Sequence, residues 1–441
     1  MNDGGGEAGL KATLGMREAI ALTVGIVVGA GIFRTPSLVA AAAGDAAVMI
    51  GAWVAGGLIS LVGALCYAEL ASTYPQAGGD YRYLTRAFGK RLGFLYGWAR
   101  LSVIQTGSIA VLSFVFGDYA SEILRLGPYS SAIYAAAIVV IITVVQWIGV
   151  RAGSALQNWL TLAEVAGLTA VIGAGLFIAP EAAPGPGPAG GPPIEMVLVF
   201  VLFTFGGWNE AAYISAEMKD ARRRMAPMLI ASLGIVTVLY VLANLAYLRA
   251  LGMGGMAGSE AVAAEVMRRA FGEGGAVLIS LFVAIAALTS ANATVFTGAR
   301  TAYALGRDHP ALAWLGRWDE GAATPRRGLV VQGAAALALV AAGAASRQGF
   351  QTAVDYTAPV FWLFFMLVGV ALFVLRAREP DIARPFKVPL YPVLPALFIV
   401  TNAYLLYSSL AYVRTGALLG LAVLAVGLML LIPIQKKEPA R

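Results

Sequence analysis

The chain has very little cysteine, histidine and charge for its length. Its 441 residues include one cysteine, Cys66, and one histidine, His309. A single thiol excludes an internal disulfide framework, a thiolate zinc site and Cys-x-x-Cys redox chemistry. A single imidazole excludes multi-histidine metal sites. We therefore expect no metal centre.

Only 12% of the residues are charged, whereas 59% are hydrophobic, and the mean hydropathy is +0.77. A soluble domain carries roughly a quarter charged residues, about twice this share. So few charges cannot cover the surface of a soluble protein of this size. The composition therefore predicts a polytopic membrane protein.

Twelve apolar stretches are separated by charged residues, and most of them reach the roughly 20 residues that an α-helix needs to cross a bilayer. The sequence therefore predicts an all-α polytopic membrane protein with twelve transmembrane helices. The predicted spans are 19–33, 46–68, 101–117, 126–150, 152–180 (interrupted by Glu164), 196–209, 225–248, 274–299, 328–346, 356–375, 388–413 and 415–435.

Most Lys and Arg residues of the connecting segments fall on one side of the membrane if both termini lie there. The positive-inside rule then predicts cytoplasmic termini and a plasma (inner) membrane location. The polar tail 1–16 lacks a cleavable signal, so we expect the first span to direct insertion. The same asymmetry explains the net charge of +7 without a nucleic acid partner.

Two predicted spans, 19–33 and 196–209, have short charge-free cores with adjacent small residues, Gly29-Ala30-Gly31 and Gly206-Gly207. Glycine weakens a helix by about 1 kcal/mol per residue, and unwound backbone at membrane depth is tolerated only where protein or a water-filled cavity satisfies it. Interrupted segments in matching positions of two halves are typical of a transporter's binding site. The alternative is that these glycines serve close helix packing.

The two interrupted segments are the first and sixth spans, which are five spans apart. Because five is an odd number, the two segments cross the membrane in opposite directions, which predicts two five-helix repeats with inverted orientation. We divide the chain into a cytoplasmic tail 1–16, a first repeat 17–180, a second repeat 194–376, two further helices 388–435 and a tail 436–441.

Several motifs in order resemble amino acid permeases of the amino acid–polyamine–organocation superfamily, and in particular the L-type amino acid transporter branch. They are Gly29-Ala30-Gly31-Ile32-Phe33 with Pro36, Tyr67-Ala68-Glu69-Leu70 with Gly78-Gly79-Asp80-Tyr81, Phe205-Gly206-Gly207-Trp208-Asn209 with Glu217-Met218-Lys219, and Arg384-Pro385-Phe386. The resemblance implies the LeuT-type fold and secondary transport of amino acids by alternating access.

A zwitterionic amino acid needs donors for its carboxylate and acceptors for its ammonium, and the ends of broken helices supply both. The resemblance adds an aromatic gate and positions for the side-chain pocket. The uncharged pocket positions predict a small or medium neutral L-amino acid, with a cationic substrate as an alternative. The predicted substrate-binding residues are Val27, Gly29, Ala30, Gly31 and Ile32 on the first span, Gly107 and Ser108 on the third, and Phe203 (the gate), Thr204, Gly206 and Asn209 on the sixth.

Glu164 falls where many relatives of this family carry a lysine that is thought to replace a sodium ion. With Thr289 and Ser290 it forms our candidate ion-coupling set. The sequence leaves open proton coupling, sodium coupling, and a structural Glu164 in an uncoupled exchanger. A channel or a nutrient receptor of this fold is the alternative outside transport.

Other charged residues at the ends of spans favour ion pairs, because intramembrane charges usually find partners. We expect Glu69 to pair beside Arg82 and Arg86, and Glu217 and Asp308 to behave alike.

No recognisable catalytic or cofactor motif is present. Gly185-x-Gly187-x-x-Gly190 matches a dinucleotide fingerprint only formally, since neither a strand nor a helix is expected around it. We therefore expect no enzyme activity and no cofactor. Animal L-type relatives are joined to a glycoprotein through an outer-loop cysteine, whereas Cys66 falls within a span, so we expect no disulfide-linked heavy chain.

Overall fold

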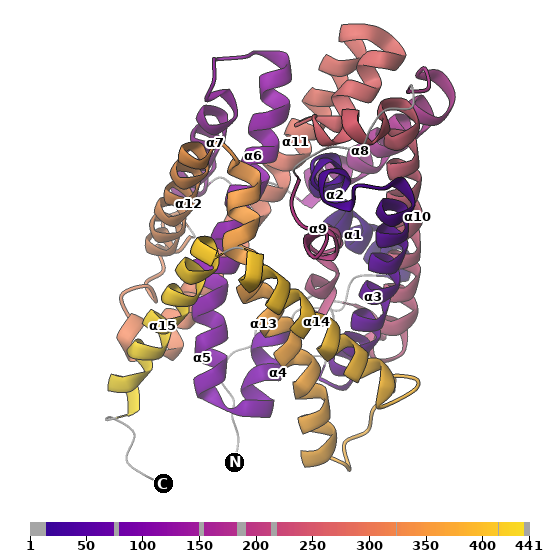
Figure 1. Ribbon diagram of the computed structural model, residues 1–441. Coiled ribbons are helices and arrows are strands. Elements are labelled where there is room, and N and C mark those ends of the chain that lie inside the picture. The colour runs from indigo at the N-terminus through magenta and orange to yellow at the C-terminus, as the bar shows by residue number, and fades with distance from the viewer. Residues whose placement is uncertain are drawn as a thin grey trace.

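The computed structural model describes residues 15–74, 79–149, 154–182, 191–212, 218–322, 324–412 and 414–435 (Figure 1). Within these ranges all regular elements are helices, apart from an isolated bridge of Asp319 with Thr324. The α-helices are α1 (Met16–Val28), α2 (Thr35–Ala43), α3 (Ala46–Thr73), α4 (Gly79–Phe88), α5 (Lys90–Ala99), α6 (Gln105–Ile123), α7 (Ser130–Ile148), α8 (Ser154–Gly173), α9 (Met196–Thr204), α10 (Ala221–Ala257), α11 (Val262–Asp308), α12 (Arg326–Ser346), α13 (Gly349–Arg378), α14 (Val393–Tyr412) and α15 (Arg414–Gln435). The all-α prediction is confirmed.

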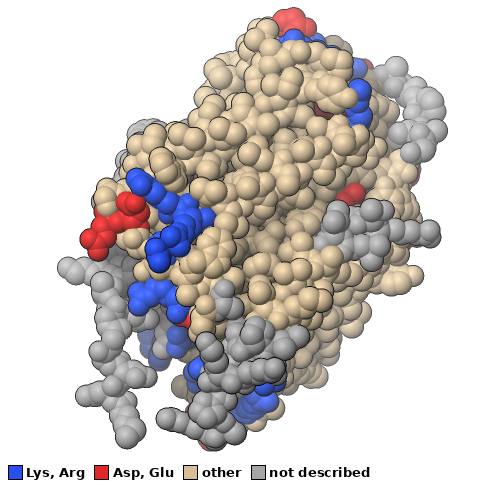
Figure 2. All heavy atoms as spheres, turned by 90° about the vertical axis from the view of Figure 1, so that its left-hand side faces the viewer, with Lys and Arg blue, Asp and Glu red and all other residues tan. Residues whose placement is uncertain are grey.

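Eight helical segments of the described chain are long and apolar enough to cross a membrane. Figure 2 shows one face of the molecule, on which a broad uncharged surface separates charged side chains gathered toward two ends. The protein is therefore a multi-pass membrane protein. The count of twelve spans stays a prediction.

The chain leaves helical conformation at both glycine clusters identified in the sequence. After α1, Gly29 has φ 30°, a 3₁₀ turn follows at Gly31–Phe33, and α2 begins at Thr35. After α9, Gly207 has φ 106° and a 3₁₀ turn spans Trp208–Ala212. Only glycine adopts these positive φ values without strain, which explains where the helices end.

The two interruptions lie against each other. A Cβ atom built on Gly207 would be 3.2 Å from the carbonyl oxygen of Ile26 in α1, which is closer than most Cβ atoms lie to a neighbouring atom. The absence of a side chain at Gly207 therefore lets the backbone of the second interruption approach the last turn of α1.

One long segment, Lys90–Ile123, passes beside these interruptions. It consists of α5, a π-helical turn at Arg100–Ile104 and α6. In Figure 1 α5 lies toward one end of the bundle and α6 toward the other. We call these ends the Glu69 end, where α3 terminates, and the Asp118 end, where α6 terminates.

Two helices are longer than the sequence predicts. α10 and α11 extend into the connection between the spans predicted at 225–248 and 274–299, with kinks at Gly252 (φ 67°) and Gly272 (φ 70°). The connection at the Asp118 end is thus largely helical, because glycine at each kink lets the chain change direction.

Candidate functional site

A cavity of about 360 Å³, the central cavity, lies between the two interrupted segments and the segment Lys90–Ile123. Figure 1 shows α1, α2 and α9 close together in this region. Most of the sequence-predicted site residues line it: Val27, Gly29, Ala30, Gly31, Ser108, Glu164, Phe203, Thr204, Gly206, Asn209 and Ser290.

Three sequence-predicted residues are not among those that line the central cavity. Gly107 faces α13, where a Cβ atom would overlap the hydroxyl group of Thr357. Ile32 is fully buried in the apolar core. Thr289 donates its hydroxyl to the carbonyl of Ile285 in its own helix, at 2.8 Å. Since neighbouring residues of a helix point about 100° apart, Ser108 and Ser290 face the cavity while Gly107 and Thr289 do not.

Tyr240 of α10 joins the two interruptions, a role that the sequence analysis missed. Its buried hydroxyl lies 2.7 Å from the carbonyl of Val27, 3.3 Å from that of Val28 and 3.2 Å from that of Thr204. The carbonyls at the end of a helix lack partners within the helix. One phenol group from α10 therefore serves the open ends of both α1 and α9.

The residues that follow the first interruption have amide groups without a partner in the described part of the chain, and two of these residues, Ala30 and Gly31, line the cavity. No hydrogen bond from the N–H groups of Ala30, Gly31 or Ile32 is found among the described residues, whereas the amide of Arg34 donates to the carbonyl of Gly31 at 3.0 Å. A cluster of free N–H groups at the start of a helix favours an anionic group such as a carboxylate.

The second interruption contributes an aromatic wall and a buried amide side chain. The ring of Phe203 packs edge-on against Phe361 of α13, with centroids 6.1 Å apart. Asn209 is buried beside it on the cavity wall. Both side chains are uncharged.

The cavity wall also contains charged residues outside the predicted pocket positions. Arg100 and Glu210 line it and form an ion pair, with Nη2 of the arginine 3.1 Å from Oε2 of the glutamate. Asp80 of α4 also lines it and accepts a hydrogen bond from Tyr96 at 3.1 Å. These charges gather toward the Glu69 end, beside the predicted binding residues and not among them.

Asp80 lies outside the membrane-spanning helices but is almost fully buried. Burial raises the pKa of its carboxyl to about 6, although the nearby Arg100 guanidinium and hydrogen bonds from Tyr67 and Tyr96 favour the charged form. A carboxyl in this range changes its protonation near neutral pH. Asp80 is therefore a second titratable group beside the cavity, which the sequence analysis did not single out.

Glu164 of α8 lies at the cavity wall with only 7% of its surface exposed. The same wall contains Gly25, Ile26 and Ser290, of which Ser290 belongs to the candidate ion-coupling set. Within the described part of the chain Glu164 has no hydrogen bond or ion pair. A buried carboxyl without a partner is costly when ionised, so a proton or a cation is needed to stabilise it.

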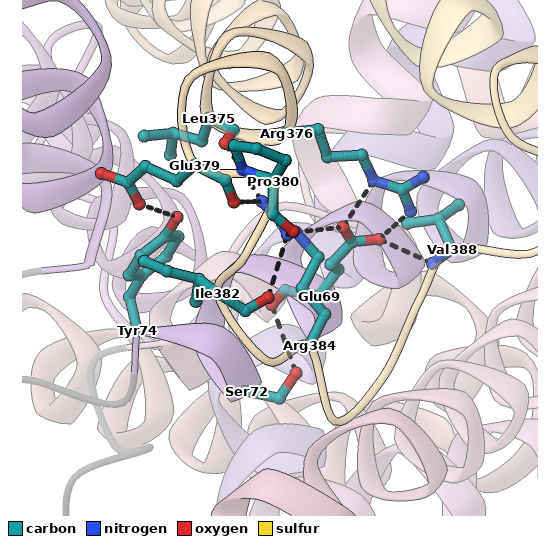
Figure 3. Close-up of polar contacts among 10 residues, drawn as sticks. All are labelled: Glu69, Ser72, Tyr74, Leu375, Arg376, Glu379, Pro380, Ile382, Arg384 and Val388. Atoms are coloured by element: carbon teal, nitrogen blue, oxygen red, sulfur yellow. Dashed lines mark hydrogen bonds and ion pairs between the residues drawn. The ribbon is translucent and has the colours of Figure 1, made fainter.

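The expected partners of Glu69 are wrong. Glu69 is 1% exposed and accepts hydrogen bonds from both Arg376 Nε (2.7 Å) and Nη2, and from the amide of Val388 (2.7 Å), while Nε of Arg384 lies 3.6 Å away (Figure 3). These contacts of Glu69 join the end of α3 to α13 and to the α13–α14 connection. We call Glu69, Arg376, Arg384 and Val388 the Glu69 cluster.

Of the two arginines expected beside Glu69, Arg86 binds Glu379 instead, at 2.8 Å, and Tyr74 donates to the same carboxylate at 2.6 Å. Asp308 accepts a hydrogen bond from Tyr81 at 3.4 Å. Glu217 lies outside the described residues.

The site residues that the sequence analysis missed are mainly charged residues, which it used only to mark the ends of the apolar stretches. Arg34, Arg100, Asp118 and Glu210 each border a predicted charge-free stretch. In the structure all four form ion pairs beside the central cavity. Their opposite signs near the ends of spans were the available signal.

Comparison with known proteins supports a common architecture along nearly the whole chain. The family model described as "Amino acid permease" matches residues 14–430. The b(0,+)-type amino acid transporter 1 of Mus musculus is 30% identical over 409 residues, which cover 90% of this chain and 82% of the relative. The Large neutral amino acids transporter small subunit 2 of Mus musculus is 30% identical over 440 residues, which cover 97% and 81%. The corresponding human proteins are 29% and 30% identical, covering 90% and 96% of this chain and 82% and 80% of the relatives. These relatives are transporters and not enzymes.

Proposed function

Because the chain belongs to the amino acid permease family, we propose that it is a secondary active transporter that moves small or medium neutral L-amino acids by alternating access. The observation that carries this proposal is the central cavity between two interrupted helices, whose ends present backbone groups to it. A zwitterion needs donors and acceptors without a fixed counter-charge, and such helix ends provide both.

In this proposal the carboxylate binds the free amides of Ala30 and Gly31, which line the cavity, and not that of the buried Ile32. The ammonium binds carbonyls at the ends of α1 and α9, including Val27 and Phe203. Val27 already accepts from Tyr240, and Phe203 accepts from the amide of Gly206. Since a carbonyl oxygen has two lone pairs, each keeps capacity for the ligand. The ring of Phe203 closes over the bound substrate.

The uncharged residues near these backbone groups favour a neutral side chain. Ser108, Phe203 and Asn209 line the cavity there, while Arg100 and Glu210 neutralise each other. Burying an unpaired charged side chain in such a site costs several kcal/mol. The name of one relative, Large neutral amino acids transporter small subunit 2, agrees with a neutral substrate but specifies a larger one than we propose.

The proposed architecture is the LeuT-type fold with twelve spans and inverted repeats at 17–180 and 194–376. Both termini are cytoplasmic, in the plasma (inner) membrane, according to the distribution of Lys and Arg. Cys66 is 1% exposed inside α3, so transport proceeds without a disulfide-linked second subunit.

Uptake of radiolabelled amino acids into proteoliposomes tests the proposed substrate class. Unlabelled leucine, alanine or serine should compete for the label, and arginine and glutamate should compete poorly, since the proposed pocket residues Ser108, Phe203 and Asn209 offer no counter-charge. Better competition by arginine would instead support the cationic alternative. Flux that shows no counterflow of internal and external amino acid would favour a channel.

Coupling is proposed to involve Glu164, with a proton favoured over sodium and over an uncoupled exchanger. Glu164→Gln imitates the protonated carboxyl, so it should abolish accumulation driven by a pH gradient and leave counterflow exchange intact. Asp80→Asn is the matched control, because it removes the other buried carboxyl at the cavity wall. Gradient-driven accumulation that persists in Glu164→Gln but is lost in Asp80→Asn would transfer the role to Asp80.

A further inference from the structure

Exposed tryptophan side chains gather where the connection between α11 and α12, residues 309–325, meets the end of α7. A Cβ atom on Gly149, directly after α7, would overlap the carbonyl of Ala322 in this connection. Both segments lie at the Glu69 end, since Asp308, the last residue of α11, accepts a hydrogen bond from Tyr81 of α4. The exposed tryptophans of this region are Trp147, Trp314 and Trp318, with 43%, 48% and 38% of their surface accessible.

The connection buries its leucines and exposes its tryptophans. Leu312 and Leu315 are at most 4% exposed and belong to an apolar cluster that includes Phe94 of α5. Trp314 and Trp318 are exposed instead. A large apolar ring is unfavourable in water, but tryptophan is favoured at the boundary between the hydrocarbon and the headgroups of a bilayer. The exposure of these rings therefore indicates contact with the membrane surface.

Arginine side chains lie over two of these rings. The guanidinium carbon of Arg326 is 4.5 Å from the centre of the Trp147 ring, and that of Arg300 is 5.8 Å from the centre of the Trp318 ring. A cation within about 6 Å of an aromatic ring is attracted by the charge distribution of the ring. Positive charge therefore lies directly beside the exposed rings.

Four of the five arginines between positions 300 and 327 have no carboxylate partner among the residues that the structure describes. Arg326 is the exception, because its Nη1 lies 2.9 Å from Oδ2 of Asp319. Arg327 donates to the main-chain carbonyl of Trp314 at 2.9 Å. We call the exposed rings and the arginines without a carboxylate partner the Trp–Arg surface, which consists of Trp147, Trp314, Trp318, Arg300, Arg307, Arg317 and Arg327.

Acidic side chains do not neutralise this surface. Asp319 is paired with Arg326, and Asp308 lines a cavity of about 150 Å³ together with Tyr81. Glu320 is the remaining acidic residue of this part of the chain, and it is exposed. Even with Asp308 and Glu320 both ionised, the four guanidinium groups leave the Trp–Arg surface positively charged.

We propose that the Trp–Arg surface binds the headgroups of anionic phospholipids. Trp147 precedes the last residue of α7, a helix long and apolar enough to cross a membrane, so the surface lies where this helix leaves the bilayer. A guanidinium group donates two parallel hydrogen bonds to a phosphate, which suits it to a lipid headgroup. The rings and the charges thus fit the same occupant, with the rings at the top of the acyl chains and the arginines on the phosphates.

This inference needs only the membrane location of the protein and not its transport function. In the proposed topology the Glu69 end faces the cytoplasm, and basic segments are attracted to the anionic lipids of that leaflet. Each arginine near such a surface strengthens binding by roughly fivefold. Several arginines without carboxylate partners on one surface therefore favour anionic over zwitterionic lipid.

Thermal unfolding of the purified protein in detergent micelles tests the proposal. Phosphatidylglycerol or phosphatidylcholine is titrated into the micelles, and the midpoint of unfolding is measured at each lipid fraction, because a ligand that binds the folded state raises the midpoint. Phosphatidylglycerol should raise it at a lower lipid fraction than phosphatidylcholine. Combining Arg307→Gln with Arg317→Gln should increase the half-saturating fraction of phosphatidylglycerol by roughly fivefold for each arginine removed. The lipid-free midpoint of each variant is its own reference, so a variant that folds less well remains informative.

Arg222→Gln combined with Arg223→Gln is the matched control. These two arginines are exposed at the start of α10, at the same end of the molecule, but lie outside the Trp–Arg surface. Their removal should change the half-saturating fraction by at most about twofold. Equal losses in the two double variants would show that the net charge of this end alone attracts the lipid, and would overturn the proposed surface.

Two further outcomes would also overturn the proposal. One is an equal response of the wild-type midpoint to phosphatidylglycerol and phosphatidylcholine, because the arginines would then contribute nothing. The other is an equal rise with inorganic phosphate in lipid-free micelles, because the ligand would then be a free anion and not a lipid.

Discussion

Gly31→Val should abolish binding of a neutral amino acid while the protein remains folded. A Cβ atom at this position lies 3.4 Å from Cγ2 of Thr204 in the facing helix end, so the two methyl groups of valine must occupy the space through which the carboxylate approaches. Losing two charge-assisted hydrogen bonds, worth about 1.5 to 3 kcal/mol each, weakens binding by roughly a hundredfold or more. Calorimetric titration of the purified protein in detergent measures the change.

Gly31→Ala is the matched control. The single Cβ atom makes an ordinary contact with Thr204, and Gly31 does not have a positive φ, so alanine should bind substrate with at most about a tenfold loss. An unchanged melting temperature in both variants shows that the loss is local. Wild-type affinity in Gly31→Val would refute the proposed carboxylate site at the first interruption.

Of the substitutions that we propose, removal of the Glu69 carboxylate should destabilise the fold most. Glu69→Ala leaves Arg376 and Arg384 without their buried counter-charge and the amide of Val388 without its acceptor. Breaking a buried ion pair by removing one partner costs about 3 to 5 kcal/mol. The loss should appear as a lower midpoint of thermal unfolding in detergent.

A nearby pair provides the comparison for this experiment. Glu379 binds Arg86 at the same end of the molecule, but 38% of the arginine side chain and 23% of the glutamate side chain are exposed. Exposed pairs contribute about 0 to 1 kcal/mol, so Glu379→Ala should change the midpoint little. Equal effects of the two substitutions would show that burial does not determine the contribution of the Glu69 cluster.

Local features of the sequence predicted the helical class and the two interruptions. Long charge-free stretches need no knowledge of packing to indicate helices. The clusters at Gly29 and Gly206 indicated where backbone leaves the helix, since glycine alone tolerates the required φ values. Most of the cavity lining follows from these positions because the interruptions face each other.

Ion-pair partners were not predictable, because they depend on how distant segments pack. Glu69 and Arg376 are 307 positions apart, and Arg34 and Asp118 are 84 apart. Nothing in the spacing of charges distinguishes Arg376 from the nearer Arg82 and Arg86 as a partner. Only the arrangement of α3 beside α13 decides between them.

The sequence also did not predict which side of each helix faces the cavity. A helix that is apolar on all sides gives no periodic signal for its buried face, so Gly107 and Ser108 could not be separated by pattern. The π-helical turn at Arg100–Ile104 also rotates the residues that follow it relative to a regular helix.

The contacts of Tyr240 have a mechanical consequence. A phenol has one proton, yet three carbonyl oxygens lie within 3.3 Å of this hydroxyl, on two separate helices. It can therefore hand its hydrogen bond from one oxygen to another as α1 and α9 shift relative to α10, without passing through an unbonded state. Tyr240 therefore keeps the ends of α1 and α9 joined to α10 and still allows the orientation of each helix end to change.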